Sequence, residues 1–146
     1  MVRLPRLTVS VAVLALCAIL PGVASAADEQ SAAPAGGRFF ELRVYTTAEG
    51  KLDALKARFR DHTNDLFRKH GMEIIGFWTP AEGPKSQNTL IYILAYPSKE
   101  AREKSWKEFE ADPDWKKARA ESEKNGKIVL HVESTFMTPT DFSPMK

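Results

Sequence analysis

The chain has 146 residues, of which 43% are hydrophobic and 27% are charged. Its 21 basic and 19 acidic residues give a formal net charge of +2, and like charges form no long block. This balance excludes the basic surface that a nucleic-acid partner would need, and a single cysteine excludes a disulfide framework.

The first 26 residues have the pattern of a secretory signal peptide, with a positive start and a small-residue cleavage site at Ala24-Ser25-Ala26. The apolar stretch from Leu7 to Leu20 is shorter than the ~20 residues of a membrane-spanning helix, although an uncleaved anchor is the alternative. Cleavage after Ala26 removes Cys17 and brings the net charge to about zero. We therefore expect an exported protein, periplasmic or secreted, without a membrane span after cleavage.

Residues 27–37 are small and polar, and we interpret them as a flexible leader to one domain over residues 38–146. The segment Arg38 to Thr46 alternates apolar and polar residues and predicts the first strand. Glu41 and Arg43 lie on the polar side of this strand. We expect that side to belong to the face of the sheet that no helix covers.

Apolar residues recur at helical spacing from Lys51 to His70, and Gly71 provides the stop signal. His62 lies inside this apolar stripe, so we expect its imidazole to face the sheet. An imidazole in that place could act as a general base. The alternative is a histidine at the edge of the core, bonded to a backbone carbonyl or to water.

Two apolar runs on either side of a turn rich in proline and glycine, residues 80–88, predict a β-hairpin. The second run, Leu90 to Tyr96, is apolar on both faces. Such a strand must be buried on both faces, and two helices can cover only one of them. We therefore expect a homodimer in which a second copy covers the helix-free face, with Ile91 and Ile93 or their alternates in the interface.

Ser98 is the predicted N-cap of a second helix, which Asp112-Pro113 interrupts and Asn125-Gly126 ends. Lys127 to Thr138 is the last predicted strand, and the tail after it has no regular period. The order β-α-β-β-α-β predicts a ferredoxin-like α+β sandwich, a four-stranded antiparallel sheet with two helices on one face.

Four segments resemble the NIPSNAP family, and the likeness covers nearly all of residues 39–144. They are FELRVYT, FRDHTNDLFRKHGMEIIGFWTP, YILAYPSKEAREKSWKEFEADPDWKKARAESE and VESTFMTPTDFSP. The resemblance implies a dimeric α/β barrel, in which two such sheets pack face to face, but it implies no particular reaction. Relatives by fold include cofactor-free monooxygenases, haem-binding enzymes and stress-related binding proteins, so the fold alone is weak ground for a function.

Six residues are candidates for a ligand site between the helices and the sheet. They are His62, Trp78, Trp106, Trp115, Arg119 and Tyr96. The aromatic side chains would suit a flat or apolar ligand, and ordinary core packing is the alternative. Arg119 lies one turn after Trp115 and could hold a carboxylate at the mouth of a pocket, or it could rest its stem on the indole in solvent.

Metal and cofactor sites are not predicted. His62, His70 and His131 lack the spacing of two ligands on one helix. The sequence has no glycine-rich phosphate loop and no Gly-x-Ser-x-Gly motif. One histidine would suffice as an axial haem ligand, but nothing else marks such a site.

The most consistent interpretation is an exported homodimer that binds a small apolar or aromatic molecule in a cavity between helices and sheet. Two alternatives stay open. One is a cofactor-free monooxygenase or isomerase with His62 as its base, in a cavity that excludes water. The other is a scaffold that binds a partner protein and no ligand.

Overall fold

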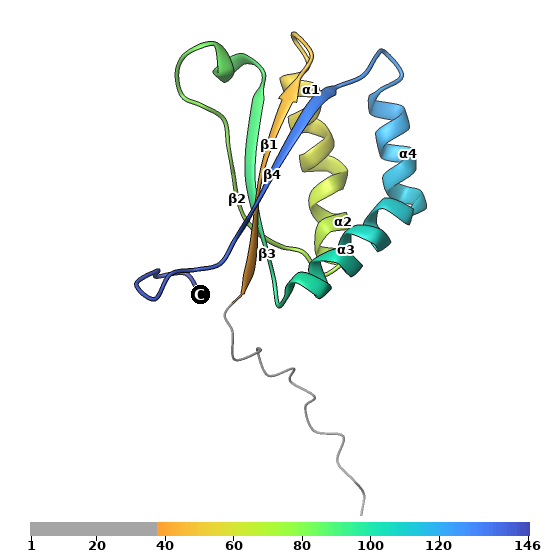
Figure 1. The fold of residues 1–146 in the computed structure, drawn as a ribbon. Helices are drawn as coiled ribbons and strands as arrows, with labels where there is room; N and C mark the ends of the chain where they lie inside the picture. Colours follow the sequence, from red (N-terminus) through yellow and green to blue (C-terminus); the bar gives the residue numbers. More distant parts are fainter. Residues whose placement is uncertain (1–37) are drawn as a thin grey trace, which may run out of the picture. The chain divides into compact units, whose positions relative to one another are not determined.

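The computed structural model describes residues 38–146, and the predicted signal peptide and leader lie outside the described residues. Four strands form one antiparallel sheet in the spatial order β2-β3-β1-β4. The strands are β1 (Phe39–Thr47), β2 (Glu73–Trp78), β3 (Thr89–Tyr96) and β4 (Val129–Met137). The α-helices of these residues pack on one face of the sheet (Figure 1), so the predicted ferredoxin-like α+β sandwich is confirmed.

The helices follow the two predicted helical regions closely. The first region consists of α1 (Leu52–Arg58), a π-helical turn η1 (Phe59–Thr63) and α2 (Asn64–Lys69). The second is divided into α3 (Lys99–Ala111) and α4 (Pro113–Ser122). A short 3₁₀ helix, η2 (Pro84–Gln87), lies in the connection between β2 and β3.

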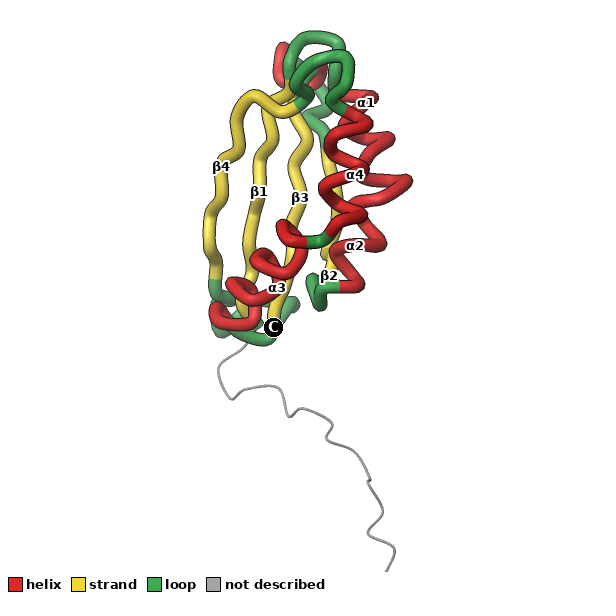
Figure 2. The backbone as a smooth tube through the Cα atoms, turned by 90° about the vertical axis from the view of Figure 1, so that its right-hand side faces the viewer, coloured by secondary structure: helices red, strands yellow, loops and turns green. Residues whose placement is uncertain are grey.

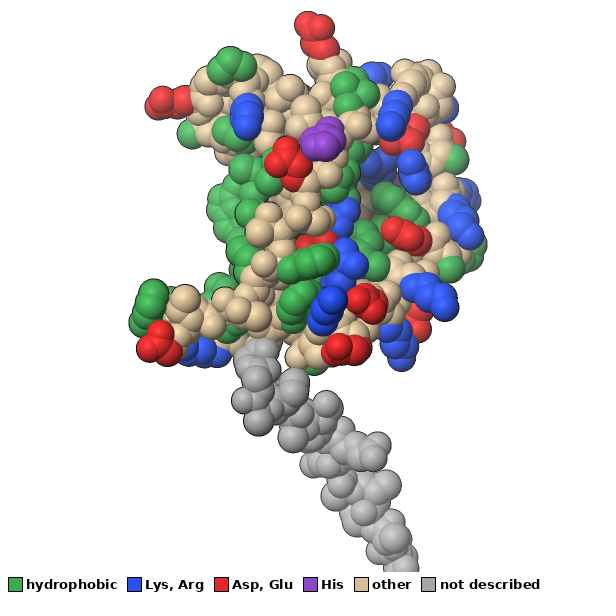
Figure 3. Space-filling model, in the orientation of Figure 1, with side chains coloured by type: hydrophobic (Ala, Val, Ile, Leu, Met, Phe, Trp, Pro, Cys, Tyr) green, Lys and Arg blue, Asp and Glu red, His purple; other side chains and the backbone are tan. Residues whose placement is uncertain are grey.

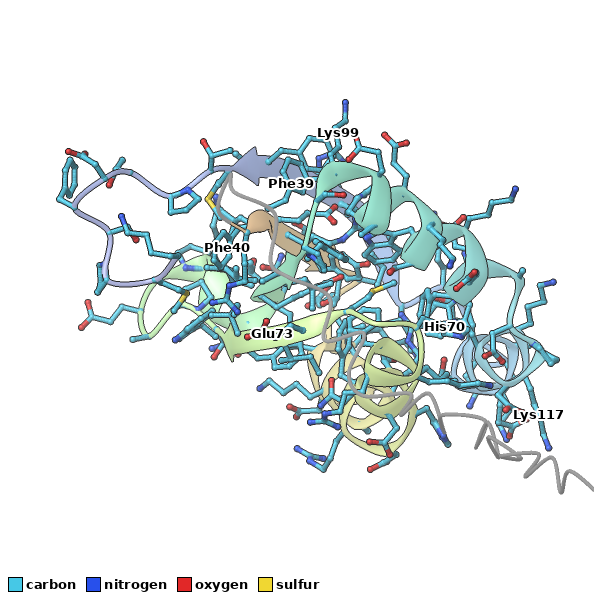
Figure 4. All side chains as sticks on the ribbon, turned by 90° about the horizontal axis from the view of Figure 1, so that it is seen from below. Phe39, Phe40, His70, Glu73, Lys99 and Lys117 are labelled. Atoms are coloured by element: carbon cyan, nitrogen blue, oxygen red, sulfur yellow. The ribbon has the colours of Figure 1, made fainter. Side chains whose placement is uncertain are left out.

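Asp112 ends α3 and begins α4. Its Oδ1 accepts a hydrogen bond of 2.8 Å from the Asp114 amide, and Pro113 stands in the first turn, where no amide donor is needed. Its Oδ2 lies 2.8 Å from Lys69 Nζ and 2.7 Å from His70 Nε2, and these bonds lower the pKa of the carboxyl. Figure 4 shows His70 between the end of α2 and the turn joining α3 to α4. Asp112 therefore ties the two helical regions together.

The π-helical turn η1 decides which side chains of the first region face the sheet. The Asn64 amide bonds to the Phe59 carbonyl, five residues back instead of four. Each residue of such a turn advances by less than the about 100° of an α-helix, so the following side chains rotate around the axis. Thr63 is thereby buried and His62 is exposed. The expectation that His62 faces the sheet is wrong for this reason.

The core fills the space between the sheet and the helices. Alternate residues of β3 point into it, and Tyr92 and Leu94 are fully buried against helical residues such as Leu55 and Phe67. The other core members on β3 are Leu90 and Tyr96. The intervening Ile91 and Ile93 therefore point away from the helices, which identifies the side of β3 that the sequence pattern left undecided.

Strand β1 presents the opposite face from the one predicted. Glu41 points toward the helices and is fully buried, where it bonds to Trp106 of α3. Arg43 shares this side, whereas Leu42 pairs with Ile93 on the other. The expectation that Glu41 and Arg43 lie on the helix-free face is wrong. Hydrogen bonds to the buried carboxylate offset its loss of water, so the polar side of the strand can enter the core.

We use the name open face for the side of the sheet that points away from the α-helices. Its apolar surface is formed by side chains from the inner strands β1 and β3 and from the edge strand β2, namely Leu42, Val44, Ile91, Ile93 and Trp78. The β2–β3 connection and the tail after β4 both project on this side (Figure 1). Hydrophobic side chains gather between these two projections (Figure 3), so the open face is a recessed apolar surface.

Candidate functional site

A cavity of about 550 Å³ lies on the other side of the sheet, between β1, β4 and the helices. In Figure 2 no helix crosses the upper part of β4, and nearly every residue of that strand is exposed. Figure 3 shows the resulting hollow, with hydrophobic side chains inside it. The aromatic residues that line it are Tyr45, Phe59, Phe67, Trp106, Phe109 and Trp115. We call it the helix-side cavity.

Charged side chains surround these aromatic walls, and positive ones are in excess. The cationic residues of the lining are Arg43, Arg58, Lys116, Arg119 and Lys127. Against these five stand only two acidic residues, Glu110 and Glu123. An apolar interior with a net positive surround favours ligands that combine a flat apolar body with a negative group.

Arg43 enters the cavity from β1. Its Nη1 donates to Glu41 Oε1 over 2.7 Å and its Nη2 to the Tyr45 hydroxyl over 3.3 Å. The guanidinium carbon lies 4.2 Å from the centre of the Trp106 ring, within cation–π range. Its Nε is buried and finds no hydrogen-bond partner within residues 38–146.

Arg58 enters from the end of α1, and only 3% of its side chain is exposed. Its Nη1 donates to Ser122 Oγ and to Glu123 Oε1, each over 3.2 Å. Its guanidinium carbon lies 5.4 Å from the centre of the Trp115 ring. As with Arg43, its Nε is buried and lacks a partner in the described part of the chain.

Glu41 lies behind the Trp106 wall and connects β1, β3, β4 and α3. Its two oxygens accept six hydrogen bonds of 2.7–3.2 Å. The donors are Arg43, Arg102 (two bonds), Trp106, Tyr96 and Ser134. Burial opposes ionisation of this carboxyl, but the bonds and charges of Arg102 and Arg43 outweigh burial and hold its pKa at about 2.

Three of the six predicted site residues line the helix-side cavity: Trp106, Trp115 and Arg119. Tyr96 does not, because it is buried behind the wall and donates its hydroxyl to Glu41. The two remaining candidates lie elsewhere. His62 is exposed on the outer side of its helix, and Trp78 is on the open face.

Trp78 lies over Gly76, two residues earlier in β2. A Cβ atom placed on that glycine would stand 2.7 Å from the indole, so only glycine leaves room for the ring. The indole is still 49% exposed, a large apolar surface on the edge strand of the open face.

Sequence reasoning missed Arg43 and Arg58. Arg58 sits three residues after Leu55 and one before Phe59, so its helical position already placed it among buried residues. Glu41, Arg43 and Tyr45 alternate along β1 and so share one side of that strand. An acidic residue, an arginine and a tyrosine on the same side of one strand can bond to one another, so this pattern was a signal for a buried polar network.

Replacing His62 with alanine is expected to change the free energy of unfolding by less than about 0.5 kcal/mol, because the side chain is exposed. Thr63→Ala is the matched control. It removes a buried methyl and the 3.2 Å hydrogen bond from Thr63 Oγ1 to the Arg58 carbonyl, which together cost about 1–2 kcal/mol. Urea unfolding of both variants checks the assignment of the π-helical turn. The reverse order of the two losses would contradict it.

Residues 38–146 hold no group of three or more histidine, cysteine, aspartate or glutamate side chains placed to bind one metal ion. In the same range, no helix combines the length and the hydropathy of a membrane span.

Comparisons with known proteins agree with this fold. The NIPSNAP family model matches residues 40–144. A NIPSNAP family protein of unknown function from Agrobacterium tumefaciens is 24% identical, with a TM-score of 0.66 over 77% of this chain and 96% of that one. A NIPSNAP-like domain protein from Burkholderia xenovorans is 18% identical, with a TM-score of 0.65 over 75% and 90% of the two chains.

A more distant structure, from Nitrosomonas europaea, is named as an antibiotic biosynthesis monooxygenase. It is 11% identical, with a TM-score of 0.53 over 76% of this chain and 96% of that one. At this identity the likeness concerns the fold alone. A search of curated protein sequences gave no match.

Proposed function

The chain belongs to the NIPSNAP family, and we propose that it is an exported homodimer whose protomers each bind a small apolar or aromatic molecule in the helix-side cavity. One observation carries the ligand-binding part of this proposal: an aromatic-walled cavity of about 550 Å³. That volume falls in the range of roughly 300–1,000 Å³ typical of small-molecule sites.

The walls of this cavity are held in place by ring contacts between different elements. Phe67 of α2 meets Trp106 of α3 at a centroid distance of 5.6 Å, nearly at right angles. Phe109 of α3 meets Trp115 of α4 at 4.5 Å. Contacts of this kind fix the ring positions before a ligand arrives, which reduces the entropy lost on binding.

A second copy of the chain is the proposed cover for the open face. Ile91 and Ile93 occupy its centre, and Trp78 exposes 49% of its surface there. The two projecting segments beside this face would reach around a partner sheet (Figure 1). The tail carries Phe142, which is 83% exposed, an apolar side chain that a partner would bury. Two-fold pairing of identical faces is the commonest assembly of such chains.

The geometry supports binding better than the enzymatic alternative. That alternative used His62 as a base inside the cavity, and His62 is exposed and absent from the cavity lining. The likeness to a monooxygenase-named protein gives a fold and no catalytic residue. A scaffold without a ligand would have no use for a preformed aromatic cavity, although the same open face would serve it.

Filling the cavity tests the proposal. Val132 lines it from β4 and Val132→Trp would place an indole inside. With the neutral fluorescent probe N-phenyl-1-naphthylamine, we expect the wild-type protein to bind and Val132→Trp to bind at least 10-fold more weakly. Lys107→Trp, at an exposed position of α3 outside the lining, is the matched control and should bind like wild type.

Equal binding by Val132→Trp and wild type would place the probe elsewhere and contradict the cavity proposal. Absence of probe binding by wild type would contradict it as well. Native mass spectrometry of protein purified from the exported fraction adds an independent measurement, since a resident ligand would appear as a constant extra mass per chain.

A further inference from the structure

We propose that the ligand of the helix-side cavity is an aromatic anion, such as an aromatic carboxylate, whose negative group is bound by Arg58. This inference rests on the proposed function and narrows it to a ligand class. It is carried by three features of the cavity wall: the order of its aromatic rings, the sharing of its carboxylates and the unpaired donors of its arginines.

The rings of the wall form one continuous row with an arginine at each end. Trp106 contacts Phe109 at a centroid distance of 5.5 Å, and Phe109 contacts Trp115 at 4.5 Å. Arg43 lies over the first indole at 4.2 Å and Arg58 over the last at 5.4 Å. All five residues line the cavity. A flat molecule resting on this row would place its ends beside guanidinium groups.

The two carboxylates that bond to Arg43 and Arg58 are each shared by two guanidinium groups. Glu41 bonds to Arg43 at 2.7 Å and to Arg102 at 2.8 Å. Glu123 bonds to Arg58 at 3.2 Å and to Arg119 at 3.4 Å. Each cluster therefore has two positive charges for one negative charge. An incoming anion would neutralise the excess positive charge of the cluster at either end of the row.

Arg58 is the better binding end of the two. Only 3% of its side chain is exposed, against 13% for Arg43. Its 3.2 Å contact with Glu123 is also longer than the 2.7 Å contact of Arg43 with Glu41. Its buried Nε has no partner within residues 38–146. An unpaired buried donor costs about 1–3 kcal/mol unless a ligand or water satisfies it. The Arg58 guanidinium therefore has hydrogen-bonding capacity that its partners in the described residues leave unused.

Two probes that differ by one anionic group test the assignment. N-phenyl-1-naphthylamine is neutral, and 1-anilinonaphthalene-8-sulfonate is the same ring system with a sulfonate. We expect wild-type protein to bind the sulfonate at least 10-fold more tightly. Arg58→Met keeps the length of the side-chain stem and should remove this preference, while binding of the neutral probe changes less than about 2-fold. Arg60→Met, an exposed arginine outside the lining, changes the net charge equally and should keep the preference.

Each outcome decides between the two proposals. A neutral probe that binds without any sulfonate preference overturns the anion assignment and leaves the cavity proposal standing. Absence of binding by both probes overturns both. Equal weakening of the binding of both probes by Arg58→Met would show that Arg58 only packs the wall, and would overturn its role.

If Arg58→Met does not fold, a variant of the half-exposed Arg119 provides the test. Arg119→Met leaves Glu123 to Arg58 alone and should lower the sulfonate preference about 3-fold. An unchanged preference overturns the proposal.

Discussion

Replacing Glu41 with glutamine is expected to lower the free energy of unfolding by about 3–5 kcal/mol at neutral pH, the range for breaking a buried ion pair by removing one partner. The fully buried carboxylate accepts six hydrogen bonds from three strands and α3. Glutamine retains the shape but not the charge, so Arg43 and Arg102 would lose their common counter-charge. An amide also has one acceptor oxygen, which leaves several donors unpaired.

The pH dependence of stability separates charge from shape. The pKa of Glu41 is about 2 in the folded protein against an ordinary value of 4.5, so the unfolded chain takes up the proton first. This contribution is fully present above pH 4.5 and is lost as the pH falls from there toward 2. The difference between wild type and Glu41→Gln should therefore shrink across that window. Other carboxyls with lowered pKa values, such as that of Asp112, act equally in both proteins.

Urea unfolding at pH 7 and at several values down to pH 2.5 measures both effects. The matched control is Glu103→Gln, an exposed glutamate on α3 next to Arg102, which should stay within about 0.5 kcal/mol of wild type. A loss below about 1 kcal/mol for Glu41→Gln, or a difference that does not depend on pH, would show that Glu41 does not hold the core together.

Replacing Ile93 with aspartate is expected to convert the proposed dimer into monomers, raising the dimer dissociation constant 100-fold or more. Ile93 belongs to the inner strand β3 and pairs with Leu42 of β1 on one side and Gly76 of β2 on the other. It therefore lies in the middle of the open face. Two-fold symmetry would bury the introduced charge twice in each dimer, without a partner for either copy. Sedimentation velocity over a range of protein concentrations measures the change.

Leu130→Asp is the control for this substitution. Leu130 is an apolar residue of β4 that is 58% exposed and lines the helix-side cavity instead of the open face. A charge there should leave the assembly intact. A wild-type domain that sediments as a stable monomer would contradict the proposed dimer, whatever the variants do.

The fold could be predicted from the sequence because each element carries its own signal. The alternation in β1, the doubly apolar β3 and the caps at Ser98 and Asp112 each depend on neighbouring residues alone. These signals give the number, the order and the approximate ends of the elements. They do not decide whether the polar side chains of β1 face the helices or the open face. Both faces of the sheet are lined by apolar side chains, so the pattern favours neither of them for the polar side of β1.

The candidate site could be predicted only in part. The aromatic residues of α3 and α4 indicated a cavity, and Trp106, Trp115 and Arg119 do line one. The position of His62 could not be foreseen, because a π-helical turn changes the helical phase without an obvious residue signature. The burial of Glu41 and Arg58 had a signal in the local sequence, but their hydrogen-bond partners come from distant parts of the chain and could not be foreseen.

The position of β1 between β3 and β4 has a consequence for the nascent chain. Among the strands of residues 38–146, β1 leaves the ribosome first and its neighbour β4 last, and Val44 pairs with Glu133 across that separation. The sheet therefore cannot close until almost the whole domain has been synthesised. Late completion of the sheet favours passage through a translocation channel before folding, which suits the export that the first 26 residues predict.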